Sequence, residues 1–110
     1  MEIINYDDFA KLEIRIGTIL SVETIEGADK ILKLMVDVGE EAPRQILSGI
    51  RTFFADPQEL VGKQCPFLTN LAPRTIRGLE SNGMILAAGD GETFSLLHPA
   101  KELPHGTEVH

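Results

Sequence analysis

Between Leu12 and Val22 the chain alternates, position by position, between two kinds of residue. Every second position carries one of Leu12, Ile14, Ile16, Thr18, Leu20 and Val22. A helix repeats its apolar residues at spacings of three and four, so a period of two over this length predicts a long strand with one buried face. Gly17 stands inside the stretch and predicts a bulge or a sharp bend. The pattern therefore indicates a fold built around a β-sheet.

Shorter patterns of the same kind predict the rest of the sheet. Further strands are expected over 32–38, 44–48, 64–71, 84–88 and 93–97. Residues 26–30 read as a loop before the second strand, and Asp90-Gly91 reads as a hairpin turn between the last two. Pro66 cannot donate a ladder hydrogen bond, so we expect it at an edge or on an unpaired side of its strand.

Two short helices are predicted from capping residues. Asn5 precedes a helix over 6–11, with acidic residues in the first turn, where the helix dipole favours negative charge. Asp56-Pro57 begins a second helix that ends at Gly62.

These elements predict an all-β fold, a five-stranded oligonucleotide-binding (OB) barrel with two short helices. The chain of 110 residues fits a single domain over 1–110. A β-sandwich is the alternative, but it would usually need about seven strands. The one cysteine, Cys65, excludes an internal disulfide, and no apolar run approaches the about 20 residues of a membrane-spanning helix. No secretory signal is visible, so we expect a cytoplasmic protein without a membrane partner.

Composition and motifs argue against an enzyme. No nucleophile motif or phosphate-binding loop is present, and His98, His105 and His110 lack the spacing of metal ligands. We therefore expect no catalytic residues, no metal and no cofactor. The net charge of −7 argues against nucleic acid as a partner, although binding depends on where charges lie and not on their sum.

The segment 70–89 is the remaining candidate for function, because its first half follows no strand or helix period. Arg74, Arg77, Ser81 and Asn82 offer two guanidinium groups, a hydroxyl and an amide behind Pro73, which suits phosphate and sugar contacts. A solvated loop without function is the equally simple alternative.

The chain resembles a known family in ordered blocks along its whole length. The matching blocks are 7–19, 27–39, 48–50, 57–63, 70–88 and 99–106. The family is the tRNA-binding domain found as a free-standing dimeric protein and as a C-terminal domain or beta subunit of methionyl-tRNA synthetase. The resemblance implies an OB barrel, a homodimer, tRNA as ligand and a catalytic synthetase chain as a further partner. It also implies RNA contacts by Lys30, Lys33, Asn70, Arg74, Arg77 and Ser81.

Two departures and two alternatives accompany this resemblance. Thr75 stands where the family often has a second basic residue, and Pro66 replaces a β-branched strand residue. A related secretion-associated chaperone binds peptides and carries a different stretch at 44–50, so a peptide-binding dimer is the alternative function. A module that only dimerises is the third. A homodimer is also expected from apolar residues at both ends, since one small barrel has little interior for both sets: Ile3, Ile4, Tyr6, Phe9, Phe94, Leu96, Leu97 and Leu103.

Overall fold

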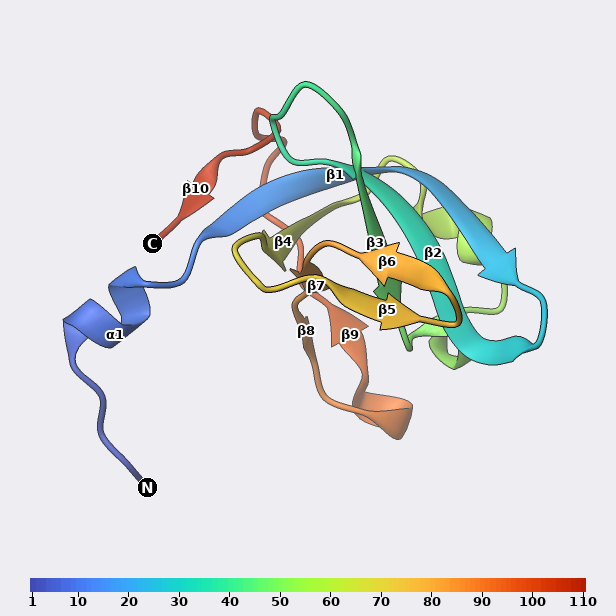
Figure 1. Cartoon of the computed structure of the whole chain (residues 1–110), viewed down its shortest axis with the longest axis horizontal. Helices are drawn as coiled ribbons and strands as arrows, with labels where there is room; N and C mark the ends of the chain where they lie inside the picture. The colour runs from blue at the N-terminus through green and yellow to red at the C-terminus, as the bar shows by residue number, and fades with distance from the viewer.

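The computed structural model describes all residues from 1 to 110, and the chain is mostly β, as predicted (Figure 1). The main sheet has six strands in the order β3-β2-β1-β4-β7, and β10 pairs with β1. These strands are β1 (Ile14–Ile25), β2 (Ala28–Asp37), β3 (Arg44–Ser48), β4 (Gln64–Leu68), β7 (Met84–Ile85) and β10 (Glu108–Val109). No ladder joins β3 to β7, so the pairing is open between these two edges.

Two small hairpins and four short helices complete the chain. The hairpins are β5 (Arg74–Ile76) with β6 (Leu79–Ser81), and β8 (Ala87–Ala88) with β9 (Ser95–Leu96). The helices are α1 (Tyr6–Ala10) and the 3₁₀ turns η1 (Arg51–Phe53), η2 (Pro57–Leu60) and η3 (Gly91–Thr93). None of them is long and apolar enough to cross a membrane.

The long first strand is present, and Ile16 and Val22 of its predicted face are buried, but Leu12 and Leu20 are exposed. Its pairing with β2 shifts between Ile19 and Ser21, so Leu20 is an unpaired extra residue. Such a bulge moves the following side chains to the other face. Ile19 and Val22 therefore both lie in the core, whereas Leu20 is 45% exposed.

Gly17 has a different role from the predicted bend. A Cβ atom added there would lie 2.6 Å from Val36 Cγ1 and 2.9 Å from Phe67 Cδ1. Real Cβ atoms do not approach so closely, so the glycine lets the Phe67 ring pack directly against the backbone of β1. The bend that the sequence suggested is supplied three residues later, at the Leu20 bulge.

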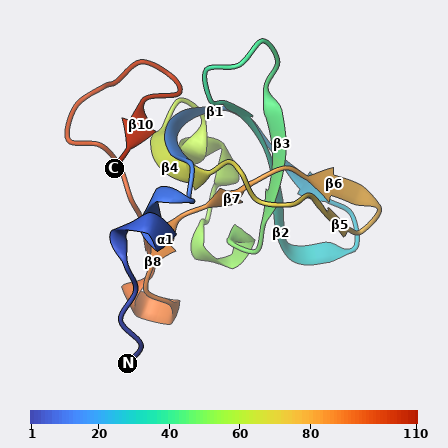
Figure 2. The same cartoon turned by 60° about the vertical axis from the view of Figure 1, so that its left-hand side comes forward.

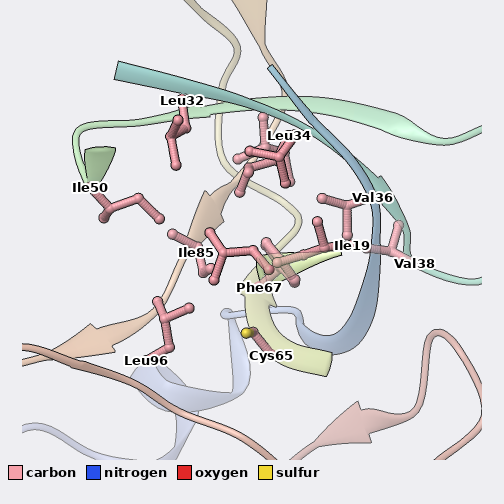
Figure 3. Close-up of a cluster of buried hydrophobic side chains, with 13 residues drawn as sticks. Ile19, Leu32, Leu34, Val36, Val38, Ile50, Cys65, Phe67, Ile85 and Leu96 are labelled. Carbon is pink, nitrogen blue, oxygen red and sulfur yellow. The ribbon is translucent and has the colours of Figure 1, made fainter. Parts of the chain in front are cut away.

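The core is one cluster of 13 buried residues drawn from the main sheet, η2 and β9 (Figure 3). Phe67 is fully buried and lies in its middle, and Phe54 and Phe94 pack against its rim. Cys65 is also fully buried, and desolvation raises the pKa of its thiol to about 11. The cysteine is thus a small core residue, and its Sγ lies 3.6 Å from His98 Nδ1.

Several predicted boundaries agree with the structure and others need correction. The third strand has the expected bounds, and Asp56 accepts a hydrogen bond from Gln58 N at 3.0 Å to cap η2. The loop expected over 26–30 is wrong, because β2 already begins at Ala28 after a turn at Glu26-Gly27. The turn at Asp90-Gly91 is longer than predicted, since η3 lies between β8 and β9.

Pro66 stands opposite Ile16 of β1 without a hydrogen bond between them, and on its other side it lies just outside the β4–β7 ladder. It faces Ile16 in β1, whose N–H donates to Thr107 O and whose carbonyl accepts from Gly106 N. No hydrogen bond from Pro66 to β1 is therefore missing. On the opposite side of β4, the carbonyl of Pro66 accepts a hydrogen bond from Leu86 N.

Candidate nucleic-acid interface

The segment expected to be an irregular loop forms the β5–β6 hairpin. Arg74 pairs with Ser81 and Ile76 with Leu79, so Arg77 and Gly78 make a two-residue turn. Both turn residues are left-handed, with φ of 53° and 79°. Such turns match the twist of paired strands, and glycine at the second position favours them. The Arg77-Gly78 pair was the sequence signal for this hairpin.

Arg77 is the only residue other than glycine with a positive φ in the chain. A left-handed conformation is unfavourable for a side chain of this kind, and strained residues often lie at functional sites. The turn points the Arg77 side chain to solvent at the hairpin tip, where it is exposed.

The hairpin is fastened to β3 at its base. Asn82 N donates to Gln45 O at 2.9 Å, and Gln45 Nε2 donates to Glu80 O at 2.9 Å. Leu47 N donates to Ser81 Oγ at 3.0 Å. Ser81 is only 2% exposed. Its hydroxyl therefore holds the hairpin to β3 and does not lie on the surface with the two arginines.

The hairpin tip meets the start of β2, and both views show the two turns side by side (Figures 1 and 2). A hollow of about 350 Å³ lies between them, with Lys30, Ile76 and Arg77 in its lining. The half-buried Ile76 side chain lies in this hollow rather than in the core cluster. Lys30 and Arg77, far apart in sequence, are thereby brought to one site.

Lys33 and Asn70 are engaged elsewhere. Lys33 faces Glu23 across the β1–β2 ladder, with Nζ 3.6 Å from Glu23 Oε1. The Asn70 side chain accepts from Glu13 N at 2.8 Å and donates to Lys11 O at 2.6 Å. Asn70 therefore fastens the end of α1 to the chain after β4, away from the hairpin tip.

The basic residues divide into paired and unpaired sets. Four form ion pairs with carboxylates: Lys11 with Asp8, Arg15 with Glu13, Lys33 with Glu23 and Arg44 with Glu40. The other six have no carboxylate partner: Lys30, Arg51, Lys63, Arg74, Arg77 and Lys101. The hairpin arginines thus carry charge that no neighbour neutralises, and Glu80 does not pair with either.

In two of these ion pairs the arginine shifts the pKa of its partner. A hydrogen bond from Arg15 keeps the pKa of Glu13 below its usual range, and two from Arg44 do the same for Glu40. The Glu40 carboxylate in turn raises the pKa of Arg44. These two arginines are committed to the fold, which leaves the unpaired set for an anionic ligand.

Sequence reasoning missed Arg51 as a member of the unpaired set. Its Nη1 donates to Ala28 O at 3.3 Å, which holds it beside the start of β2. No motif marked this residue, and only the fold brings it near Lys30.

The exposed cations of the hairpin and of β2 can hold phosphate oxygens, because guanidinium and ammonium groups form charge-assisted hydrogen bonds to them. No group of three or more His, Cys, Asp or Glu side chains could hold a metal ion anywhere in the chain.

Comparison with known proteins gives a consistent result. Residues 14–108 match the family described as "Putative tRNA binding domain". A methionine–tRNA ligase of Methanococcoides burtonii is 51% identical over 110 residues, which cover 99% of this chain and 16% of that protein. The chain spans only 15 to 16% of the first curated ligases that it matches.

Two solved structures are similar over the whole chain. A MetRS-related protein from Pyrococcus horikoshii has a TM-score of 0.91 at 35% identity, with 100% of both chains covered. The chaperone CsaA of Bacillus anthracis has a TM-score of 0.87 at 30% identity, with 99% of this chain and 100% of that chain covered.

Proposed function

The chain belongs to the tRNA-binding domain family, and from this premise we propose that it binds folded tRNA through the β5–β6 hairpin and the start of β2. The observation that carries the proposal is the unneutralised charge of Lys30 and Arg77 on one exposed site, with the exposed and unpaired Arg74 further along the same hairpin. In a chain of net charge −7, such a concentration needs a ligand that is itself anionic.

The chemistry of the hairpin favours reading of shape over reading of base sequence. It offers guanidinium groups to phosphates and no aromatic ring on which a base could stack. We therefore propose structure-specific binding, in which unrelated tRNAs have similar affinities.

We further propose that the fold is an OB barrel closed by the contacts between β3 and residues 80–82. Gln45, Leu47 and Ser81 supply these hydrogen bonds in place of a ladder. OB folds bind nucleic acid at the loop between the first two strands and the loop before the last strand. In this chain those loops are the β1–β2 turn, after which Lys30 lies near the start of β2, and the β5–β6 hairpin, which carries Arg74 and Arg77.

A homodimer is the proposed assembly, supported by apolar side chains that the single chain leaves in water. Ile3 is 93% exposed and Tyr6 76%, on an N-terminal arm that extends away from the sheet in both views (Figures 1 and 2). Leu97 is also exposed. Leu96, in contrast, lies in the core cluster and Phe94 packs against that cluster, so neither is available for the dimer contact expected from the sequence. A second copy would cover the arm about a two-fold axis.

Replacing Ile4 and Tyr6 with serine is expected to weaken self-association several-fold, because both side chains lose their apolar contact with the partner. Sedimentation equilibrium at micromolar concentration is the measurement, with the 12.1 kDa chain as the mass unit. Val61→Ser is the matched control, since Val61 is also an exposed aliphatic residue but follows η2 and is not part of the N-terminal arm. A wild-type chain that sediments as a monomer would contradict the dimer.

The proposed biological role is that of an accessory module without catalysis of its own. The matched ligases contain this unit as a small part of their length. We propose that the chain presents tRNA to a catalytic methionyl-tRNA synthetase in the cytoplasm, either in trans or as its beta subunit. Purified chain alone should then not charge tRNA with methionine.

A fluorescence titration tests the function. We expect the chain to bind several unrelated tRNAs with affinities within a few-fold of one another, and to bind less well at higher salt, because counterions are released from the RNA. The similarity to the chaperone CsaA favours peptide as the second candidate ligand. Saturable binding of unfolded peptides with no binding of any tRNA would contradict the proposed function and favour peptide binding instead.

A further inference from the structure

Four hollows on the surface form a connected series that begins at the hairpin tip. The tip hollow shares Asp29 with a second hollow that Arg51 lines. The second shares Phe54 with a third, of about 330 Å³, which holds Phe53. The third shares Lys63 with a fourth, of about 430 Å³, which Lys101 lines. The four hollows are thus neighbours along one path over the surface, which a linear ligand could follow from the tip.

Charge is segregated toward this series of hollows. Their linings contain five basic residues, all from the unpaired set, and three carboxylates. Of the chain's 10 basic and 17 acidic residues, that leaves five basic and 14 acidic for everything else. The path is net positive on a protein that is net negative, which is the complementarity a polyanion requires.

The third hollow also holds an aromatic platform, which the hairpin lacks. The Phe53 and Phe94 rings stack in parallel, 3.9 Å apart and inclined by 5°, and Phe54 meets Phe94 edge-on. Phe53 is 36% exposed, whereas Phe54 and Phe94 pack against the core. Phe53 is therefore a ring held in place by a second ring and still open to a ligand.

We propose that the RNA site continues past Arg51 onto Phe53 and Lys63, and that this extension takes an unpaired segment of the bound RNA. The inference rests on the proposed function and adds a second contact to it. A base within a duplex cannot reach a ring on a protein surface, whereas an unpaired base stacks on it readily. The cations before and after Phe53 hold the phosphates on either side of the stacked base.

Photo-crosslinking tests the contact directly. A single-stranded oligouridylate of about eight nucleotides that contains one 4-thiouridine is a suitable probe, because one OB fold covers about that length. Trypsin cleaves after Arg51 and Lys63 and nowhere between, so the peptide 52–63 contains Phe53 together with Phe54. We expect the probe to crosslink to this peptide, and a tRNA competitor to abolish the crosslink.

Variants separate stacking from charge. Phe53→Leu keeps an apolar side chain but removes the ring, and is expected to weaken binding of the probe by about fivefold or more. Phe53→Tyr keeps the ring and should retain the affinity. Lys63→Gln should weaken binding and reduce its salt dependence, whereas Lys11→Gln should not, because Lys11 is paired with Asp8 and lines no hollow.

The outcomes distinguish this inference from the proposed function. If the double variant R74A/R77A loses tRNA while Phe53→Leu and Lys63→Gln bind both RNAs like wild type, the extension is overturned and the hairpin site stands. If oligoglutamate displaces the probe as well as RNA does, the path is a general anion surface and the stacking proposal fails. If the wild-type chain binds no tRNA, the proposed function falls and the extension falls with it.

Discussion

Replacing Arg74 and Arg77 together with alanine is expected to weaken tRNA binding by more than about tenfold and to flatten its dependence on salt. Each guanidinium group offers charge-assisted hydrogen bonds to phosphate worth roughly 1.5–3 kcal/mol. Both are exposed and neither has a carboxylate partner, so their removal leaves the core and the ion pairs unchanged. Titration of tRNA at two or more salt concentrations gives both quantities.

The left-handed turn calls for a variant that protects the fold. Arg77→Gly suits the positive φ at this position better than alanine does, so the R74A/R77G variant should keep the hairpin and still lose the affinity. The R74K/R77K variant keeps both positive charges. Its tRNA binding should keep most of the salt dependence but lose the bidentate contacts that guanidinium groups make to phosphate. A double alanine variant with full affinity and an unchanged salt slope would show that the hairpin is only a solvated structural element.

Replacing Phe67 with alanine is expected to lower the free energy of unfolding by about 3–5 kcal/mol. The ring is fully buried in the middle of the core cluster and lies against Gly17 (Figure 3). Its removal opens a cavity that the surrounding strands cannot fill. Since small domains are stable by only about 5–15 kcal/mol, urea denaturation should show a midpoint shifted far toward lower concentrations.

Two further variants test the reason for this effect. Phe67→Leu fills most of the space and should be clearly less destabilising than Phe67→Ala. Gly17→Ala on its own overpacks the contact, because its Cβ would lie 2.6 Å from Val36 Cγ1 and 2.9 Å from the Phe67 ring. In the Phe67→Ala background the clash with the ring is gone and only the one with Val36 remains. The two changes should therefore be less harmful together than their sum. Simple additivity would contradict direct packing of the ring on Gly17.

Local signals in the sequence determined the secondary structure of much of this chain. Two-residue alternation predicted β1 and β2, and β3 has the predicted bounds. The cap at Asp56 predicted η2, because its oxygen bonds the nearby Gln58 N–H. Such signals depend on residues a few positions apart, so they can be read without knowledge of the fold. Ordered resemblance along the chain likewise identified the family.

The facing of side chains could not be read in this way. The bulge at Leu20 is defined by the partner strand, which pairs Val36 with Ile19 and Met35 with Ser21. No property of residues 14–25 alone reveals that Leu20 is the residue without a partner on β2. The sequence therefore predicted the strand correctly but its buried face only in part, since Ile16 and Val22 are buried whereas Leu20 is exposed and Ile19 takes a place in the core.

The candidate site was decided by tertiary structure for the same reason. Arg74 and Arg77 could be proposed from their chemistry, but only the fold shows that Lys30 joins Arg77 and that Ser81 is buried against Leu47. Whether a cation is free depends on which carboxylates the strands place beside it, as Glu23 is placed beside Lys33. Charge counted along the chain is a sum, whereas charge available to a ligand is set by long-range pairing, and that pairing exists only in the folded protein.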